Sequence, residues 1–454
     1  MTEVSAASGS SAGVAHNSSA VNSVVVIGLG NAGLPVACAL AAAGYRVVGV
    51  DVDAEKVRRV GKGQDPNSDP DPELPDLLRR ATADGRLTAV VGTSEVSAPD
   101  VLIFIVQTPI TVSHLPDNAP LEGALKSAAR LVRPGCLVIV ESTLAPGTME
   151  SVVRPQLERL TGLRVGADFA LVHVPERLMP GRSIRNIRTL SRVIGAWSPE
   201  DGARAVAFYR PVINADLDVV DCATAEVVKT AENAYRDVQI AFANELALLC
   251  EMVGANVWRV RDLVNKVPER NVHYPGPGVG GHCIPKDPWL LAAAAPGTAR
   301  LIAAAREVND SMPAFVVSRV IELLADADVP LAAARVALLG LSYLADSPDS
   351  RNAPSEVVAR GLRERGVGDL RMHDPLIDGM NRSLDDVLMA ADVAVLLVKH
   401  RAYRDEDWAA RVSKMRRRIL FDTRNLIPGD ISGASVVRLG VQAPKGARRA
   451  SATA

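Results

Sequence analysis

The chain has 454 residues, a hydrophobic content of 48% and a formal net charge of -1. The length predicts about three domains, and the composition is that of a globular protein. The charge excludes a broadly cationic surface for nucleic acid or acidic membranes, so we expect neither as a partner, whereas small anionic ligands can still bind a local basic pocket. The five cysteines are scattered and form no Cys-x-x-Cys pair, which argues against a disulfide framework or a metal site and favours a reducing cytosol.

Both ends of the chain have the composition of disordered segments. Residues 1–20 are rich in Ser, Ala and Gly and contain no Lys or Arg, so we expect a disordered leader and not a signal peptide. Residues 441–454 are predicted to be a disordered tail. The sequence has no apolar run long enough to span a bilayer, and we expect a cytoplasmic protein.

The first third of the chain has the pattern of a dinucleotide site. An apolar strand at residues 24–27 runs into a glycine turn, a helical stretch follows over residues 34–43, and a second strand at residues 46–50 ends in an acid. An acid at that distance can hydrogen-bond the ribose 2′-hydroxyl, which favours NAD over NADP. The predicted cofactor-binding residues are Gly28, Gly30, Asn31, Ala32, Gly33 and Asp51.

Three further apolar strands end at polar side chains. Strand 101–106 leads to Thr108, strand 137–140 to Thr143, and strand 171–174 to Glu176 and Arg177. Ligands of open α/β sheets collect at the carboxyl ends of the strands, so these side chains are candidate cofactor or substrate contacts. The alternative for the threonines is that they satisfy backbone groups of the turns. The alternative for Glu176 and Arg177 is a surface ion pair.

A long helix is predicted over residues 223–253, with Gly254 as its stop. It is too apolar to stand alone, so we expect it to join domains or to pack against a second subunit, most simply in a homodimer. Lys229 and Asn233 are four residues apart and share one face of this helix. Both side chains could simply be solvated.

A glycine-rich loop presents a cysteine beside a lysine and an aspartate. Its glycines permit positive φ and close backbone approach, so a substrate can reach the sulfur of Cys283, which is a candidate nucleophile. A helical pattern starts at Trp289, and the positive end of that helix would stabilise a thiolate. The alternative is a structural cysteine, with Asp287 and Pro288 serving as the N-cap and first residue of the helix.

The last third repeats the alternation of strands and helices. Strands are predicted at residues 336–340, 370–374, 393–398 and 419–422, with a helix after Pro354. The glycine fingerprint is incomplete, so this sheet is expected to bind something other than the dinucleotide. Arg351 and Arg424 lie just beyond strands and suit a phosphate.

The predicted fold class is therefore α/β. We expect two Rossmann-like parallel-sheet domains, at residues 21–210 and 316–440, joined by a long central helix and a helical middle domain at residues 211–315 that carries the Cys283 loop.

Taken together, these motifs resemble the UDP-glucose/GDP-mannose dehydrogenase family over nearly the whole chain. The Gly-Pro-Gly-Val-Gly-Gly-His-Cys run that ends at His282 and Cys283 resembles the branch that oxidises UDP-N-acetylmannosamine or UDP-N-acetylglucosamine, and it makes His282 the main pointer to the substrate class. The resemblance implies a UDP-sugar substrate, a role in polysaccharide biosynthesis and two NAD consumed per sugar, with the cysteine holding the substrate carbon between the two oxidations.

The resemblance also implies a role for each matching residue. Catalysis would fall to Cys283, Lys229, Asn233, Asp287, Glu176 and Thr143. The cofactor would be contacted by the glycine turn, Asp51, Thr108, Thr143, Lys286 and Arg351. The substrate would be held by Glu176, Arg177, Leu178, Lys229, Asn233, Arg270, Tyr274, Gly280 and Arg424, with Arg270 reaching across a dimer.

One position departs from the family pattern. Where the family has Phe-Lys at the end of the first strand of its last domain, this chain has Tyr343-Leu344, so a lysine that contacts the nucleotide sugar is missing. Three explanations are open: another cation substitutes for this lysine, the substrate differs, or activity is impaired. The alternative functions are a UDP-glucose 6-dehydrogenase, a β-hydroxyacid dehydrogenase, which needs no cysteine, and a catalytically silent nucleotide-sugar-binding regulator.

Overall fold

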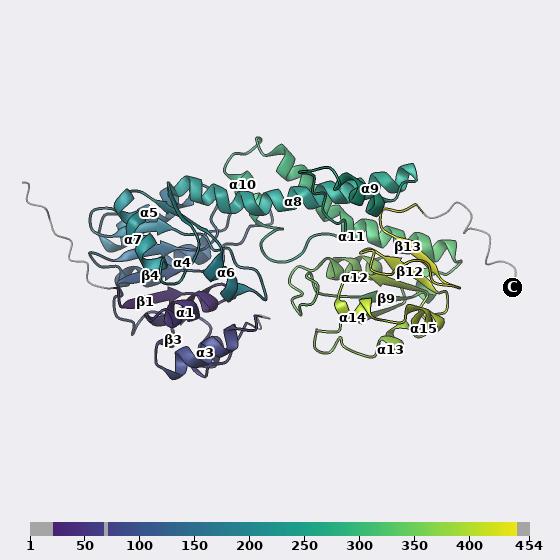
Figure 1. Ribbon diagram of the computed structural model, residues 1–454, viewed down its shortest axis with the longest axis horizontal. Coiled ribbons are helices and arrows are strands. Elements are labelled where there is room, and N and C mark those ends of the chain that lie inside the picture. Colours follow the sequence, from purple (N-terminus) through teal and green to yellow (C-terminus); the bar gives the residue numbers. More distant parts are fainter. Residues whose placement is uncertain (1–20, 68–70, 443–454) are drawn as a thin grey trace, which may run out of the picture.

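The protein consists of two lobes bridged along one side by long helices (Figure 1). The computed structural model describes residues 21–67 and 71–442. The predicted leader and residues 443–454 of the predicted tail lie outside that range. At the start of the predicted tail, Val441 pairs with Asn256 in an isolated antiparallel bridge.

The first lobe is built on an eight-stranded sheet in the order β3-β2-β1-β4-β5-β6-β7-β8. Its strands are β1 (Ser23–Ile27), β2 (Arg46–Asp51), β3 (Leu87–Val91), β4 (Val101–Phe104), β5 (Leu137–Val140), β6 (Ala170–His173), β7 (Arg192–Ala196) and β8 (Leu217–Val220). The sheet is not purely parallel as predicted, because β6 and β7 pair antiparallel. The predicted strand 101–106 ends at Phe104.

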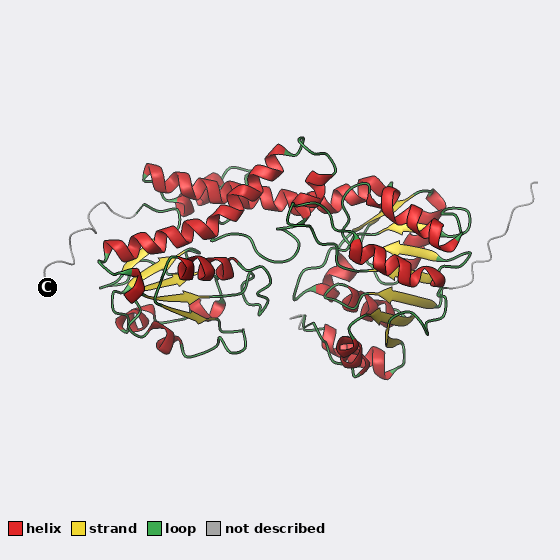
Figure 2. Cartoon of the chain, turned by 180° about the vertical axis from the view of Figure 1, so that it is seen from behind, coloured by secondary structure: helices red, strands yellow, loops and turns green. Residues whose placement is uncertain are grey.

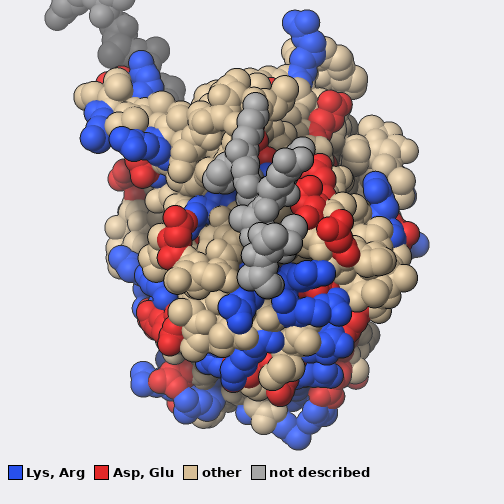
Figure 3. Space-filling view, turned by 90° about the vertical axis from the view of Figure 1, so that its right-hand side faces the viewer, with Lys and Arg blue, Asp and Glu red and all other residues tan. Residues whose placement is uncertain are grey.

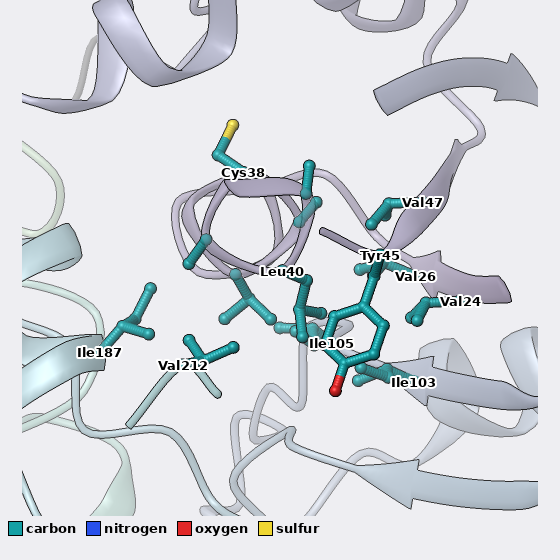
Figure 4. Close-up of a cluster of buried hydrophobic side chains, with 14 of the residues drawn as sticks. Val24, Val26, Cys38, Leu40, Tyr45, Val47, Ile103, Ile105, Ile187 and Val212 are labelled. Atoms are coloured by element: carbon teal, nitrogen blue, oxygen red, sulfur yellow. The ribbon is translucent and has the colours of Figure 1, made fainter. Parts of the chain in front are cut away.

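Helices cover both faces of this sheet, which explains why its strands are continuous apolar runs. They are α1 (Gly33–Ala42), α2 (Ala54–Gly61), α3 (Leu74–Ala83), α4 (Ala119–Ala128), α5 (Arg154–Thr161), α6 (Ser183–Thr189) and α7 (Pro199–Tyr209), with short helical turns at Ala129–Leu131 and Met149–Val153. Val24 and Val26 of β1 pack on the face covered by α1, whereas Val25 and Ile27 pack on the opposite face. Figure 4 shows side chains of β1, β2 and β4 packed against α1.

Two long helices connect the lobes. The predicted helix 223–253 is confirmed as α8 (Cys222–Val253), which Asp221 caps through the Thr224 amide and which Gly254 ends with a φ of +78°. It packs along α11 (Arg300–Asp326), and the shorter α9 (Val257–Val264) and α10 (Asp287–Ala293) lie beside them. Residues 315 and 316 lie inside α11, so the helix continues through the predicted domain boundary.

The second lobe contains a five-stranded parallel sheet in the order β10-β9-β11-β12-β13. The strands are β9 (Arg335–Leu339), β10 (Asp369–His373), β11 (Val393–Leu396), β12 (Ile419–Asp422) and β13 (Ser435–Arg438). The helices are α12 (Pro354–Glu364), α13 (Leu384–Leu388), α14 (Arg401–Arg404) and α15 (Trp408–Ser413), with a short turn at Leu331–Ala333. Helices again lie on both faces (Figure 2), and the predicted second parallel sheet is confirmed.

The surface agrees with the near-neutral formal charge. Basic and acidic side chains lie side by side over the end of the molecule seen in Figure 3. Arg335 and Arg371, for example, both contact Asp369. Among the residues described here, none of the helices is long and apolar enough to cross a membrane.

Candidate active site

The glycine turn after β1 has the geometry of a dinucleotide cradle. Gly28 has a φ of +100°, and a Cβ added there would lie 2.1 Å from the Ile105 carbonyl oxygen. A Cβ on Gly33 would lie 1.9 Å from the Gly28 carbonyl oxygen, so this glycine permits α1 to pack against the turn. A Cβ on Gly30 would meet no atom within 4 Å. That open side is where a pyrophosphate can approach the backbone, so the turn fits the cofactor that the sequence predicts.

Asp51 stands at the end of β2, beside this turn. Its Oδ2 atom accepts a hydrogen bond from the Leu29 amide at 2.9 Å and lies 3.2 Å from the Lys56 ammonium. Burial alone would raise the pKa of this carboxyl, but the Asp53 and Leu29 amides and the Lys56 charge outweigh burial, and the net pKa is lowered. An ionised carboxylate here repels a 2′-phosphate, which favours NAD.

Arg351 of the second lobe reaches across to the same turn. With the Asn31 amide oriented so that its oxygen faces the arginine, Nη1 and Nη2 of Arg351 lie 2.8 and 3.0 Å from that oxygen. Asp349 holds the guanidinium from the other side at 2.6 Å. The two lobes therefore meet at the turn that would bind the cofactor, although Asn31 and Arg351 are far apart in sequence.

The threonines after β4 and β5 lie next to each other. The Thr108 hydroxyl donates to the Thr143 carbonyl oxygen at 2.6 Å, so it satisfies a turn backbone group, as in the alternative interpretation. Thr143 is 9% exposed at the end of β5. The two threonines and Glu176 lie at the same edge of the sheet, because they follow the adjacent parallel strands β4, β5 and β6.

Glu176 forms a buried ion pair with Lys229. The Lys229 ammonium lies 3.5 Å from Oε1 of Glu176, and Oε2 accepts a hydrogen bond from the Leu178 amide at 2.6 Å. Burial opposes ionisation of Glu176, but Lys229, the Leu178 amide and Arg192 together lower its pKa. Burial likewise opposes the charge on Lys229, yet Glu176, Asp287 and Cys283 raise the pKa of its ammonium. The interpretation of Lys229 as a solvated helix residue is therefore wrong.

Arg177 does not pair with its neighbour Glu176. Its guanidinium donates to the Ser191 carbonyl at 2.7 Å and to the Ser191 hydroxyl at 3.0 Å, and it forms an ion pair with Glu232 of α8. The surface-pair interpretation of Glu176 and Arg177 is thus wrong, and Arg177 ties the segment after β6 to the long helix.

Asp287 contacts the face of α8 that carries Lys229 and Asn233. Its Oδ2 atom accepts a hydrogen bond from the Asn233 amide at 2.5 Å, and its Oδ1 atom accepts one from Lys286 at 2.6 Å. The helix α10 begins at Asp287, with Lys286 in the N-cap position and no side-chain cap. Interpreting Asp287 as an N-cap is therefore wrong, because both of its oxygens are engaged elsewhere.

The Cys283 thiol is protonated in this environment. Burial, reinforced by the charges of Asp287 and Glu176, raises its pKa to about 11, against the opposing effects of Lys229 and Lys286. The net pKa shift is therefore opposite to the direction expected from the helix N-terminus alone. Burial and the charges of Lys286 and Arg351 also lower the pKa of the adjacent His282, which favours a neutral imidazole.

The second lobe packs directly onto the Cys283 loop. A Cβ on Gly276 would lie 2.2 Å from Nη1 of Arg424, and a Cβ on Gly280 would lie 2.6 Å from Cβ of Tyr343. Gly281 donates its amide to the Arg351 carbonyl at 3.0 Å. The glycines of this loop are thus required by close packing. Arg424 is partly buried, and this desolvation lowers its pKa to about 10, while its Nε atom donates to the Leu397 carbonyl at 2.8 Å.

Comparison with known proteins agrees with this architecture. Three models of the UDP-glucose/GDP-mannose dehydrogenase family match in order: the NAD binding domain at residues 22–213, the central domain at 223–311 and the UDP binding domain at 337–429. The chain belongs to the UDP-glucose/GDP-mannose dehydrogenase family. It is an NAD-dependent nucleotide-sugar dehydrogenase, which excludes a β-hydroxyacid dehydrogenase and a silent regulator.

Relatives within this dehydrogenase family match over most of their length. The chain is 38% identical to a UDP-N-acetyl-D-mannosamine dehydrogenase of Pyrococcus horikoshii, covering 89% of this chain and 96% of the relative. It is 35% identical to an NDP-N-acetyl-D-galactosaminuronic acid dehydrogenase of Ralstonia nicotianae, with coverages of 89% and 96%. A solved structure of the Pyrococcus horikoshii UDP-D-ManNAc dehydrogenase superposes with a TM-score of 0.88 at 37% identity, covering 92% of this chain and 99% of that one.

A buried polar network that the sequence analysis missed supports the Cys283 loop of this dehydrogenase. Asn244 of α8 accepts a hydrogen bond from the Gly276 amide at 2.8 Å and donates to Asn309 of α11 at 2.8 Å. Asn309 donates in turn to Asp237 at 2.8 Å, and Arg306 contacts Asp237 at 2.6 Å. Amides and charges that recur among apolar residues along one face of a long helix are the signal that could have revealed this network.

The remaining predicted substrate residues of the dehydrogenase are more exposed. Tyr274 is 58% exposed, and the Arg261 guanidinium lies 3.6 Å from the centroid of its ring. Arg270 is exposed in the segment after α9. Leu344, at the position of the missing lysine, is 41% exposed.

The second sheet of the dehydrogenase has its own acid at the end of its second strand, but that acid is engaged. Asp374 accepts hydrogen bonds from the amides of Leu341 at 2.7 Å and Ser342 at 3.2 Å, as Asp51 does from Leu29. His400 also contacts Asp374, at 3.2 Å, and both side chains are fully buried. Because Asp374 is fully buried and already engaged, it has no exposed oxygen for the ribose hydroxyls of a second dinucleotide.

Proposed function

We propose that this enzyme oxidises the C6 alcohol of a UDP-N-acetylhexosamine, either UDP-N-acetylmannosamine or UDP-N-acetylglucosamine, to the carboxylic acid. The observation that carries the mechanism is the convergence of Lys229, Asn233, Glu176 and Asp287 around the Cys283 loop. The substrate class is supported by relatives named for N-acetylated sugars and by His282 beside Cys283. The alternative is a UDP-glucose 6-dehydrogenase.

The glycine turn, Asp51, Thr108, Lys286 and Arg351 would hold NAD, which supplies the acceptor for the two hydrides removed from C6. Because the turn belongs to the first lobe and Arg351 to the second, the cofactor would be held where the lobes meet. Thr143 lies at the same edge and would contact both the cofactor and the catalytic water.

In the first half of the reaction, Lys229 and Asn233 would stabilise negative charge on the C6 oxygen, the lysine by its charge and the asparagine by its amide. Loss of a hydride and the hydroxyl proton gives the aldehyde. Asp287, which contacts Asn233 and Lys286, would accept the proton through a water molecule.

In the second half, the Cys283 sulfur adds to the aldehyde carbon, and the thiol proton passes to the former carbonyl oxygen to give a thiohemiacetal. Loss of that proton and a second hydride leaves a thioester. Glu176, whose pKa is lowered and which is therefore ionised, would activate the water that cleaves the C–S bond. The thiol then recovers a proton, and the carboxylate leaves.

The rest of the substrate would be held by residues on both lobes. Leu178 and Arg177 follow Glu176 in the first lobe, and Arg424 lies under the Cys283 loop from the second. Arg270, Tyr274 and Gly280 belong to the segments that lead to Cys283. In this arrangement the nucleotide sugar lies between the lobes with C6 toward Cys283.

We further propose that the enzyme is a cytoplasmic homodimer and that it functions in polysaccharide biosynthesis. We also propose the domain limits that the sequence predicts. The dimer is supported by large apolar side chains exposed along α8, among them Phe242 at 55%, Leu249 at 51% and Met252 at 80%. Exposed apolar residues on one helix are typical of an interface between subunits.

A substrate panel tests the proposed function. Purified enzyme and NAD are incubated with UDP-N-acetylmannosamine, UDP-N-acetylglucosamine, UDP-N-acetylgalactosamine, UDP-glucose and GDP-mannose, and the acid product is identified by mass spectrometry. The highest kcat/KM is expected for UDP-N-acetylmannosamine or UDP-N-acetylglucosamine. A preference for UDP-glucose would overturn the assignment.

A further inference from the structure

Three loops of the second lobe meet at the carboxyl edge of its sheet. They follow β9, β11 and β12, which are adjacent and parallel. The Thr423 hydroxyl donates to the Leu396 carbonyl at 2.7 Å, which joins the start of the loop after β12 to the last residue of β11. The Asp346 amide donates to Nδ1 of His400 at 3.0 Å, which joins the loops after β9 and β11. The backbone around residue 399 is therefore fixed from both sides.

Lys399 lies in the middle loop and extends toward the segment that carries Cys283. It is exposed, although its neighbours Val398 and His400 are buried, and its ammonium lies 6.0 Å from the centroid of the Tyr274 ring. Tyr274 is only two residues from Gly276, against which the Arg424 guanidinium packs. Lys399 and Arg424 thus face the same short segment from neighbouring loops.

The loop after β9 carries Leu344, which is 41% exposed. Its side chain is apolar and supplies no positive charge. Arg424 has its Nε atom engaged with the Leu397 carbonyl. A nucleoside diphosphate brings several negative charges, which need cationic partners when they enter a cleft. Lys399 is exposed and lies on a fixed backbone between the loops of Leu344 and Arg424, so it can bind these negative charges.

We propose that Lys399 binds the diphosphate of the nucleotide sugar and so supplies the positive charge that Leu344 does not. The inference rests on the proposed function, because it assigns the diphosphate of that substrate to this edge of the second sheet. Lys399 acts in binding and takes no part in the chemistry at C6.

The test compares Lys399→Met, Lys399→Arg and the double variant Lys399→Met with Leu344→Lys. Removing the charge is expected to raise the KM for the UDP-sugar and the dissociation constant for UDP about tenfold, as for a lost contact to a charged group. The kcat and the KM for NAD should stay within about twofold, because neither the chemistry nor the cofactor site is touched. Arginine at 399, or lysine at 344 in the double variant, should restore most of the UDP affinity.

The matched control is Arg404→Met, which removes an exposed cation from the nearby helix α14. An unchanged dissociation constant for UDP in Lys399→Met, or the same loss in Arg404→Met, would overturn the inference. The UDP measurement by calorimetry is independent of turnover, so a failure of the proposed substrate assignment and a failure of the Lys399 assignment give different results.

Discussion

Asn233 of α8 donates its side-chain amide to the Asp287 carboxylate at 2.5 Å, which joins the long connecting helix to the loop that carries Cys283. The second oxygen of Asp287 accepts a hydrogen bond from Lys286 at 2.6 Å. This fully engaged carboxylate places a negative charge close to the thiol. It links Asn233, which we propose to bind the oxyanion, to the loop that carries Cys283, the proposed nucleophile.

Asp287→Asn is expected to make the Cys283 thiol more acidic. The pKa of this thiol is raised to about 11, partly by Asp287, so below that pH the thiol is protonated and the reactive thiolate grows about tenfold per pH unit. Removing the Asp287 charge lowers the pKa, so alkylation by iodoacetamide at pH 8 should be faster in the variant although turnover falls. The other four cysteines are buried, which confines early alkylation to Cys283. Asp262→Asn, at an exposed site, is the control, and slower alkylation in Asp287→Asn would contradict the account.

Alanine substitutions of two glycines in the cofactor turn should have different effects, one on stability and the other on NAD binding. In Gly33→Ala the new methyl group would lie 1.9 Å from a backbone oxygen, so we expect a loss of more than about 2 kcal/mol in the free energy of unfolding. In Gly30→Ala the methyl group meets open space, so the free energy of unfolding should stay within about 0.5 kcal/mol, whereas the KM for NAD rises. Urea unfolding and NAD titration check both variants. Unchanged NAD binding in Gly30→Ala would contradict the expectation that the pyrophosphate binds at this position.

Lys229→Met should change how stability depends on pH. In the folded wild type the pKa of Glu176 is lowered, so its stabilising contribution is present above the unfolded carboxyl pKa and is lost as the pH falls through the folded value. Without Lys229 the buried carboxyl loses its main partner and its pKa rises. The variant should lose about 3 kcal/mol of unfolding free energy near pH 7 and recover part of it toward pH 5. Arg58→Met, at an exposed ion pair, is the control. A pH-independent difference in urea unfolding would contradict the pairing.

Asn244→Leu tests the network under the Cys283 loop. The variant leaves the buried Gly276 amide without its acceptor, so we expect a loss of about 1–3 kcal/mol of unfolding free energy and a higher KM for the UDP-sugar. The neighbouring Glu245 is exposed, and Glu245→Leu serves as the control. If both variants behave alike, the network does not position the loop.

The positions of many strands, the long helix and the cofactor turn could be predicted because each depends on local pattern. Val24 to Asp51 specify strand, turn, helix and strand within one short segment, and Gly254 alone ends α8. The antiparallel pairing of β7 with β6 was missed because strand direction depends on the chain's path and not on the composition of the strand. The continuous α11 was missed because its polar residues face a partner helix, which disguises its length.

At the site, residue types were easier to predict than their partners. Glu176 and Arg177 are adjacent in sequence, but they pair with Lys229 and Glu232 of the long helix. The thiol pKa depends on burial between the lobes and on two carboxylates brought in from other segments, so the local helix N-terminus could not predict its direction. The contact between Arg351 and Asn31 likewise depends on how the lobes meet.

The number of NADH molecules formed per sugar tests the covalent mechanism most directly. Limiting UDP-N-acetylhexosamine, or whichever sugar of the panel is preferred, is consumed to completion with excess NAD, and NADH is measured by its absorbance while the acid is quantified by mass spectrometry. The account predicts two NADH and one acid per sugar in the wild type, and no acid above background in Cys283→Ser with NAD binding intact. One NADH per sugar, or acid formed at the normal rate by Cys283→Ser, would contradict a role for Cys283 as the covalent holder between two oxidations.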